Sequence, residues 1–357
     1  MYGMTILLNH VDCLLCSVMG MDSTLSQRPY DEDARGHGLV YAFLIGPDRR
    51  VDELSWSDLG TVFAQPEGCT WFHFDAAKRH AREWIQGCER LPLALREFLL
   101  DFNQRHRLER VGEAVIGAIS DVQYRFDFDP DHIATLRFYV DPRCLISTRL
   151  QPLSAPDQLR RAIRERWPFD STATLMTNLF RLQTEILVNV NTCVSEELGE
   201  VEDLILAHRI EDQRGQLGKI RRLTARLHRH FAPEHRALHA LAQRLPTWFN
   251  DQDRAVFLDT VEELGLALHD LDAIQERAKL LQEELAARVA EEINHSLFRL
   301  SVVMTVFLPM TLITGIFGMN VAGLPGLEDG SAFLWVTLIM VAAGLLTLVI
   351  LHWKRLF

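Results

Sequence analysis

A tripeptide near the C-terminal end of the chain has the residue types needed to handle a hydrated metal ion. Gly318, Met319 and Asn320 follow a long apolar stretch. Glycine lets the backbone leave a helix and aim carbonyl groups at an axis, and the asparagine amide oxygen is a neutral acceptor. A divalent ion, Mg²⁺ above all, holds its water tightly, so such oxygens would bind the hydration shell rather than strip it. These residue types are compatible with a selectivity filter, and the alternative is that Gly318 and Asn320 only cap the helix.

A stripe of residues at helical spacing precedes the tripeptide. Among its apolar members, Met304 and Leu308 are the best candidates for a constriction that closes by dewetting, with Leu297 as a third. Thr311 would offer hydroxyl groups to a hydrated ion. The alternative for any single Leu or Met is packing against lipid or a neighbouring helix. Steps of three and four predict these pore-lining residues: Asn294, Leu297, Ser301, Met304, Leu308, Thr311 and Gly315.

Other groups of polar residues give weaker signals. Glu328 and Asp329 are the only charges in the loop after the tripeptide, and they either attract cations to its mouth or form a solvated turn. His235 and His239 have a zinc-compatible spacing, but without a third ligand a solvated helix face is favoured. An acidic cluster is either an ion sensor or a charged surface: Glu196, Glu197, Glu200, Glu202 and Asp203.

No dedicated metal site built from protein ligands is predicted. The motif Cys13-x-x-Cys16 has no second pair to complete a zinc site. The sequence also contains no Gly-rich phosphate loop, nucleophile elbow or His-Glu-x-x-His motif. We therefore expect neither an enzyme nor an ATP-driven pump, and no cofactor apart from a transported cation.

Two C-terminal segments are long and apolar enough to cross a lipid bilayer. Residues 297–317 and 331–351 each span 21 residues, which covers a hydrocarbon core of about 30 Å. The connecting loop 318–330 contains no Lys or Arg, whereas the tail 352–357 contains Lys354 and Arg355. Basic residues stay on the cytoplasmic side, so we expect both termini inside and a periplasmic loop.

The first 296 residues carry the charge of the chain. They hold 34 basic and 46 acidic side chains, a net charge of −12, which argues against nucleic acid as a partner. Six scattered cysteines without a framework spacing fit a reducing cytoplasm. Met1 and Met21 both remain candidates for the true start. The expected parts are a disordered segment 1–36, an α/β domain 37–150, a helical part 151–250 and a stalk helix 251–296.

Local patterns predict the elements of these parts. Apolar positions at steps of three and four run from Phe257 to Leu297 without an interrupting Pro, which predicts one helix that continues towards Phe317. Ser171 is the expected N-cap of an earlier long helix. The expected strands are 39–45, 70–75, 111–120, 121–127, 133–140 and 144–148, and the expected helices are 78–86, 92–102, 157–166, 172–208, 213–230 and 233–244. The fold class is therefore a membrane protein with an N-terminal α/β cytoplasmic domain, whose stalk helix is continuous with the first of two transmembrane helices.

The position of Gly-Met-Asn, at the outer end of the first of two C-terminal spans, resembles the CorA superfamily of divalent metal ion transporters. The resemblance extends through Asn294, Pro309, Thr311 and Gly315 and leaves out the first 36 residues. The continuation Val321 to Gly326 is more similar to the ZntB zinc transporter branch than to the magnesium channels.

The resemblance implies a homopentamer in the bacterial inner membrane, with the first span lining the channel. Its expected function is Zn²⁺ uptake, with protons as a further coupling ion. One alternative is a Mg²⁺ (Co²⁺/Ni²⁺) channel of CorA type. A further alternative is a membrane-anchored regulatory protein that keeps the fold without transport.

Overall fold

The computed structural model describes residues 36–46, 48, 50–64, 68–102, 107–123, 132–207, 213–319 and 331–353. The chain divides into two compact units, Met1–Leu281 and Gln282–Phe357. The expectations for residues 1–35, including the Cys13 and Cys16 motif and the choice of start, lie outside the described residues.

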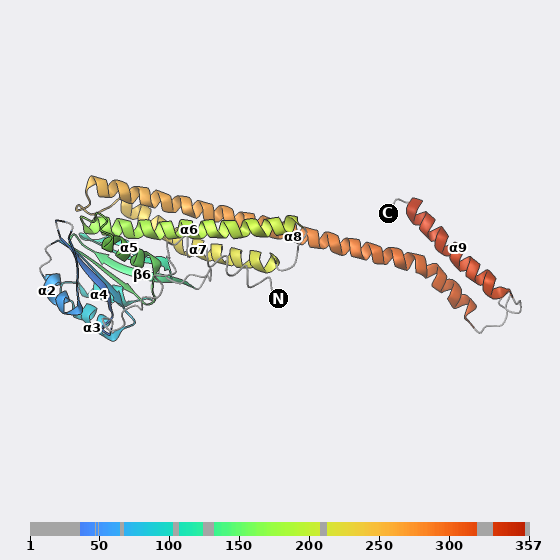
Figure 1. Ribbon diagram of the computed structural model, residues 1–357, viewed down its shortest axis with the longest axis horizontal. Coiled ribbons are helices and arrows are strands. Elements are labelled where there is room, and N and C mark those ends of the chain that lie inside the picture. The colour runs from blue at the N-terminus through green and yellow to red at the C-terminus, as the bar shows by residue number, and fades with distance from the viewer. Residues whose placement is uncertain are drawn as a thin grey trace. The chain divides into compact units, whose positions relative to one another are not determined.

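A mixed seven-stranded sheet forms the centre of the first unit (Figure 1). Its strand order is β2-β1-β3-β7-β6-β5-β4, and β3–β7 is the one parallel pair among the described strands. Alternating and continuous apolar runs rich in β-branched and aromatic residues explain these strands. Their bounds are β1 Leu39–Ile45, β2 Val51–Glu53, β3 Cys69–Asp75, β4 Arg107–Val111, β5 Ala114–Val122, β6 Ile133–Val140 and β7 Cys144–Arg149.

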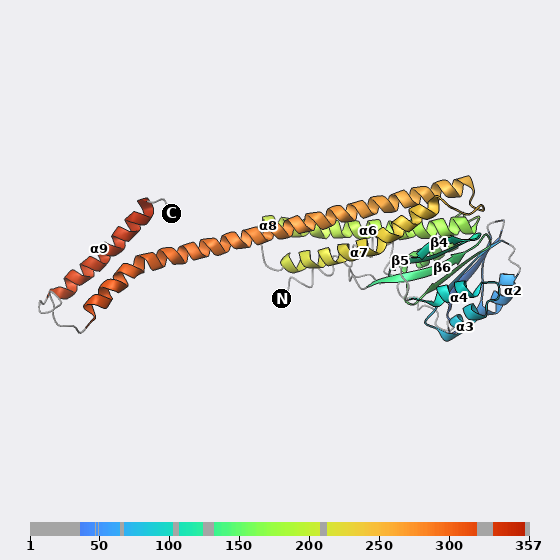
Figure 2. The same ribbon diagram turned by 180° about the vertical axis from the view of Figure 1, so that it is seen from behind.

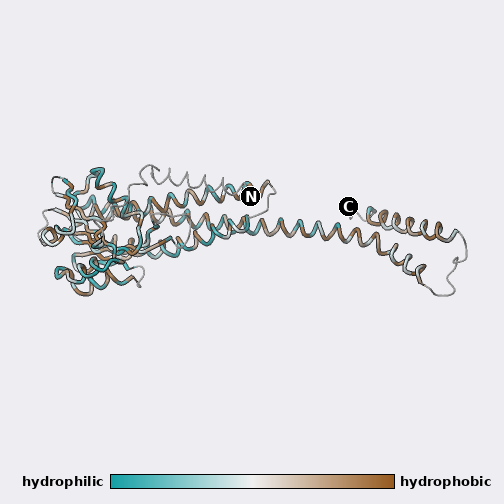
Figure 3. Tube along the Cα trace, turned by 60° about the horizontal axis from the view of Figure 1, so that its bottom comes forward, coloured by the Kyte–Doolittle hydropathy of each residue, from teal (hydrophilic) through white to brown (hydrophobic). Residues whose placement is uncertain are grey.

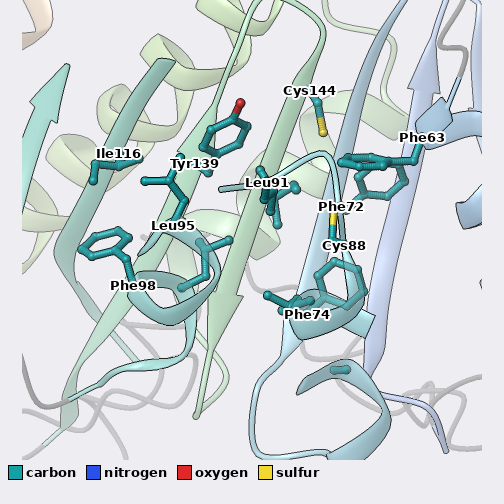
Figure 4. Packing of buried hydrophobic residues seen from close by; sticks show 14 of the residues in the cluster. Phe63, Phe72, Phe74, Cys88, Leu91, Leu95, Phe98, Ile116, Tyr139 and Cys144 are labelled. Atoms are coloured by element: carbon teal, nitrogen blue, oxygen red, sulfur yellow. The ribbon is translucent and has the colours of Figure 1, made fainter. Parts of the chain in front are cut away.

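Helices cover the sheet on two sides. On one side, the buried Phe72 and Phe74 pack against apolar residues of the first helices, as Figure 4 shows, and Ile146 belongs to the same cluster. On the other, Phe138 of β6 meets Phe180 with ring centroids 5.8 Å apart. The helices of the first side are α2 Leu59–Ala64, after the 3-10 turn η2 Trp56–Asp58, α3 Arg79–Gly87 and α4 Leu93–Leu100; those of the second are α5 Ser154–Arg164 and α6 Thr172–Leu206.

Three long helices complete the first unit, and the third of them continues beyond it. They are α6, α7 (Gln213–Ala242) and α8 (Asp251–Phe317), and Figure 2 shows α7 beside the edge strand β4 and its neighbour β5. Ser171 caps α6 as predicted, because its hydroxyl accepts from the Thr174 N–H at 3.1 Å. Phe257, fully buried, contacts Phe180 and so fixes the start of α8 against α6.

The predicted fold class is confirmed: an α/β part precedes a long helix that is continuous with the first of two apolar C-terminal helices. The predicted stripe on α8 is buried from Phe257 to Leu285, whereas Val289, Ile293 and Leu297 are exposed. The helix thus runs on from a packed region into one where its apolar side chains have no cover from their own chain.

Several element boundaries differ from the sequence expectation. The predicted strand 111–120 is confirmed in part: residues 114–120 lie in β5, whereas Gly112, at φ +65°, turns the chain between β4 and β5. The predicted boundary between residues 120 and 121 is wrong, because β5 runs on to Val122, and residues 124–127 of the predicted strand 121–127 lie outside the described residues. The predicted break before Pro233 is also wrong, because α7 runs through it. Its neighbours Phe231 and Glu234 are buried, so packing outweighs the backbone hydrogen bond that proline removes. The patterns also missed β2 and α2, whereas α8 begins at Asp251, where the stalk helix 251–296 was expected to begin.

A buried polar cluster joins the sheet to α6 and α7. The Ser120 N–H donates to Glu234 Oε2 at 2.9 Å, and Gln183 Nε2 donates to Glu234 Oε1 at 2.7 Å and also to the Ser120 carbonyl. The pairing of β4 with β5 begins at Arg107 and Ala118, so Ser120 lies beyond its end. Glu234 and Gln183 therefore give Ser120 the acceptor and the donor that a further residue of β4 would give.

Burial raises the pKa of Glu234 to about 8 and that of the nearby Asp121 to about 7. A carboxyl group whose folded pKa is raised binds a proton in the folded state when the unfolded chain has released it. Its contribution to stability is fully present below the unfolded value of 4.5 for Glu234 and is lost as the pH rises through about 8.

We expect Glu234→Gln to weaken the dependence of the protein's stability on pH. Between pH 5 and pH 8, the free energy of unfolding of the wild type should fall by roughly 3 kcal/mol more than that of the variant. Urea unfolding of the full-length protein in detergent, followed by tryptophan fluorescence, measures the difference. Glu113→Gln is the control, because a hydrogen bond from Thr247 lowers the Glu113 pKa and so keeps its titration below this range. Parallel curves for the wild type and Glu234→Gln would refute the role given to burial.

Candidate functional site

The candidate site lies on the apolar end of α8 and on α9, Ala332–Trp353. Both helices are long and apolar enough to cross a membrane, and Figure 3 shows the hydrophobic residues along them. The helix continues through Pro309 to Phe317 without interruption. Within the second unit, a helical hairpin therefore presents the residues that the sequence singled out.

The predicted pore stripe is exposed along its whole length in the single chain. Met304 and Leu308 are 61% and 73% exposed, and Leu297 is 56% exposed. Asn294, Ser301, Thr311 and Gly315 are exposed as well. A row of large exposed apolar side chains is unfavourable in water, so lipid or further protein must cover it.

A second stripe on α8 is half-buried rather than exposed. Its members are Val302, Val306, Met310, Ile313 and Phe317. The close contact is at Gly344 of α9, where a Cβ atom would lie only 2.1 Å from Met310 Cε. At 100° per residue, this stripe is centred roughly 170° around the helix from the predicted pore stripe. The two faces of α8 are therefore distinct, one packed on α9 and the other open.

Hydroxyl groups on the open side of α8 have their protons engaged by the helix. Thr311 Oγ1 donates to the Phe307 carbonyl at 2.9 Å. Thr305 Oγ1 likewise donates to the Ser301 carbonyl at 2.7 Å. Because each proton is used inside the helix, the outer lone pairs of the oxygen remain as acceptors. Thr311 can thus accept a hydrogen bond from water that surrounds a cation.

Gly318 extends the last turn of α8. Its N–H donates to the Thr314 carbonyl at 2.8 Å, and the Met319 N–H reaches the Ile316 carbonyl at 3.4 Å. Gly318 is not among the described residues with positive φ, so it is not a left-handed helix cap. A Cβ atom at this position would lie 2.9 Å from the Thr314 oxygen, closer than real Cβ contacts. A side chain at this position would therefore meet the Thr314 carbonyl, while the predicted exit of the backbone from the helix at Gly318 stays a prediction.

Some predicted site residues cannot be placed. Asn320, Glu328 and Asp329 lie outside the described residues, as do Lys354 and Arg355. Of the predicted filter, the described part is Gly318 and Met319.

The histidine pair on α7 differs from its predicted surroundings. The His235 ring sits on α8 at Gly265, where a Cβ atom would lie 2.9 Å from His235 Nε2. Burial lowers the His235 pKa, with the nearby His239 and Arg236 as further causes. The predicted solvated face is therefore wrong for His235 and right for the exposed His239. The single glycine of the first half of α8 was the available signal for this contact.

The acidic cluster on α6 is divided between different partners. Glu202 forms an ion pair with Arg277 of α8, whereas burial raises the Glu197 pKa, which Lys219 of α7 partly offsets. Among the described residues, no group of three or more His, Cys, Asp or Glu side chains is arranged to hold a metal ion.

Comparison with known proteins places these observations in one family. Residues 66–355 match the family described as CorA-like Mg²⁺ transporter protein. The zinc transport protein ZntB of Yersinia enterocolitica is 28% identical over 303 residues, covering 82% of this chain and 88% of that protein. The divalent cation transporter CmaX of Pseudomonas aeruginosa is 27% identical over 315 residues, covering 87% and 94%.

Solved structures agree with this relationship. The full-length CmaX structure has a TM-score of 0.74 at 25% identity and covers 90% of this chain and 98% of its own. The CorA magnesium transporter of Methanocaldococcus jannaschii has a TM-score of 0.75 at 17% identity and covers 87% and 96%, which shows the fold alone.

Proposed function

This chain belongs to the family of CorA-like Mg²⁺ transporter proteins, and from that premise we propose that it is a homopentamer that takes up Zn²⁺ through a pore lined by α8. At the coarser level, it is a membrane transporter of divalent cations of the CorA/ZntB type and not an enzyme. The proposal concerns the path, the number of subunits and the ion.

The observation that carries the path is the separation of the two faces of α8. One face packs on α9 through Met310 and Gly344. The opposite face, with Met304, Leu308 and Thr311, is exposed in the single chain. Two helices cannot enclose a pore, so several copies must bring their open faces together around an axis, with each α9 outside. The family resemblance implies that five subunits surround the pore.

Each part of the open face has a role in this pore. Asn294 and Ser301 lie towards the cytoplasmic end, and Leu297, Met304 and Leu308 form narrow apolar rings that dry out when closed. Thr311 and Gly315 leave room for a hydrated ion. Gly318, Met319 and Asn320 form the filter at the outer end, where their oxygens bind the water shell. Glu328 and Asp329 raise the local concentration of cations before entry.

The orientation follows from the charges at the ends of the two spans. Lys354 and Arg355 follow α9, whereas the loop between the spans has no basic residue. Both termini are therefore cytoplasmic in this proposal, and the protein is a multi-pass protein of the bacterial inner membrane. Lipid is its second partner, besides further copies of itself.

Zinc is the favoured ion because the loop after Asn320 resembles the ZntB branch, and because several similar proteins are named zinc transport protein ZntB. The name of CmaX specifies only a divalent cation. A magnesium channel is the second candidate, favoured by the family description.

Ion uptake into liposomes separates the two candidates. We expect at least tenfold faster uptake of Zn²⁺ than of Mg²⁺, and a further increase when an inward proton gradient is imposed. Proteoliposomes loaded with an ion-specific fluorophore measure both rates, with empty liposomes as the control. A rate of Mg²⁺ uptake that does not depend on the pH gradient would establish the magnesium channel instead. If no divalent ion is taken up, the remaining candidate is a regulatory protein that does not transport.

A further inference from the structure

A buried arginine at the end of β7 has no partner in the described part of the chain. The Arg149 side chain is 6% exposed, and its Nε is buried without a hydrogen-bond partner. No hydrogen bond or ion pair joins its guanidinium to a described residue. Arginine normally keeps its charged head in water, and a buried charge is unfavourable unless it is paired. Its two Nη atoms are not among the buried atoms without a partner, so the fork of Arg149 reaches the surface and is free to bind an anion.

Arg137 on the neighbouring strand β6 shows how this protein satisfies a buried arginine. It is fully buried, and its Nη1 donates to the Phe98 carbonyl at 2.9 Å. Its guanidinium also lies over the Phe98 ring at 4.8 Å and the Phe102 ring at 5.4 Å. None of these arrangements exists for Arg149, so its lack of partners is not a general property of buried arginines here.

His73 shares the face of the sheet with Arg149. In the parallel ladder of β3 and β7, His73 pairs with Ser147 and Asp75 pairs with Arg149, so alternation places His73 and Arg149 on the same side. Burial, with a smaller contribution from the Arg149 charge, lowers the His73 pKa and keeps the ring neutral. The two side chains are thus close enough to act on one ligand.

The hydrogen bonds of Ser147 decide which nitrogen of His73 carries the proton. Ser147 Oγ lies 2.7 Å from His73 Nδ1 but 3.4 Å from the Phe72 carbonyl, and it accepts from Trp71 Nε1 at 2.9 Å. The single hydroxyl proton therefore goes to Nδ1, which leaves the ring proton on Nε2. Nε2 forms no hydrogen bond with a described residue, so it is a free donor.

The acids near this face are already engaged. The buried Asp157 of α5 binds Arg160 at 2.6 Å and Arg161 at 3.1 Å. Asp75 accepts from the Ala77 N–H at 2.9 Å and forms no ion pair with Arg149. The carboxylate of Asp157 thus already pairs with two arginines, and neither Asp157 nor Asp75 pairs with Arg149. Arg149 lies at the carboxyl end of the parallel pair β3 and β7, and the carboxyl ends of parallel strands are where open α/β sheets bind ligands.

We propose that Arg149 and His73 Nε2 bind the phosphate group of a small ligand at the carboxyl ends of β3 and β7. Both groups are donors only, and a guanidinium fork matches two oxygens of a phosphate while a third oxygen accepts from the imidazole. The phosphate comes either from inorganic phosphate or from a nucleotide. The site lies in the first unit and is separate from the proposed ion path.

Binding of phosphate to the full-length protein in detergent tests this site. Calorimetric titrations in EDTA, so that no divalent ion mediates binding, compare inorganic phosphate and AMP with chloride at equal ionic strength. We expect saturable phosphate binding by the wild type and at least tenfold weaker binding by Arg149→Met. AMP that binds at least tenfold more tightly than phosphate identifies a nucleotide site, whereas equal affinities identify recognition of the phosphate alone.

Arg164→Met is the matched control. Arg164 also lies on this side of the sheet, but it is exposed and pairs with Glu53 at 2.8 Å. Its loss should leave phosphate binding within twofold. Arg149→Lys keeps the charge without the fork, so it should still fold and bind about tenfold more weakly. A wild type that binds no phosphate or AMP above chloride, or equal losses for Arg164→Met and the Arg149 variants, would overturn the proposal.

Discussion

Replacing Asn320 by alanine is expected to reduce divalent cation uptake at least tenfold while the protein still assembles. The amide oxygen of each subunit is proposed to accept hydrogen bonds from the water shell of the ion. Since each subunit contributes one amide, the substitution removes one hydrogen-bond acceptor from every subunit around the pore axis. A tenfold change in rate corresponds to about 1.4 kcal/mol in the barrier, which is modest for several lost hydrogen bonds. Initial uptake rates in proteoliposomes, at equal protein content, measure the effect.

Asn178→Ala is the matched control for Asn320→Ala. Asn178 lies on α6, where its amide donates to the Thr174 carbonyl at 2.8 Å. The same amide is deleted, but far along the chain from the proposed filter, so uptake should stay within twofold of the wild type. Wild-type uptake by Asn320→Ala would remove the filter from the proposed mechanism.

Gly318→Ala is expected to lower uptake about tenfold through the backbone rather than through a lost ligand. The added Cβ would lie 2.9 Å from the Thr314 oxygen, which belongs to the backbone and cannot move freely. The chain after Phe317 must shift, and the carbonyl groups of Gly318 and Met319 shift with it. A filter that depends on several aligned oxygens loses its fit to the water shell.

Gly199→Ala makes the same change on α6, outside the proposed pore. A Cβ at Gly199 meets nothing within 4 Å in the single chain, so the helix accepts it without strain. Its uptake should stay within threefold of the wild type. Uptake rates of both variants, with size-exclusion profiles to check assembly, provide the comparison. Equal rates for the two variants would show that the close approach at Gly318 has no functional consequence.

The long helix was predictable because its pattern is local and repeated. Apolar positions at steps of three and four, without an interrupting proline before Pro309, predicted one helix from Phe257 to Phe317. The two spans were predictable for the same reason, since length and lack of charge suffice. The open face of α8 also follows from helical spacing alone, whereas the opposite face needed the position of α9.

Contacts between distant parts of the chain could not be predicted. Glu234 accepts a hydrogen bond from the Ser120 N–H, 114 residues earlier, and nothing in the local sequence connects the two residues. The same is true of the contact between His235 and Gly265 and of the contact between Met310 and Gly344. Pro233 misled the prediction because local propensity favours a break where tertiary packing holds the helix together. Arg149 looked like an ordinary strand end until its burial was known.

The central claim is that the open face of α8 lines a water-filled path, and thiol block of Leu308→Cys tests it most directly. A membrane-impermeant thiol reagent is added to proteoliposomes during cation uptake, with the wild type as the background for the native cysteines. Leu345→Cys, at an exposed position of α9, is the control for lipid exposure. The account predicts that the reagent reduces uptake by Leu308→Cys at least fivefold and leaves the other two unchanged. Block of Leu345→Cys with no effect on Leu308→Cys would contradict it.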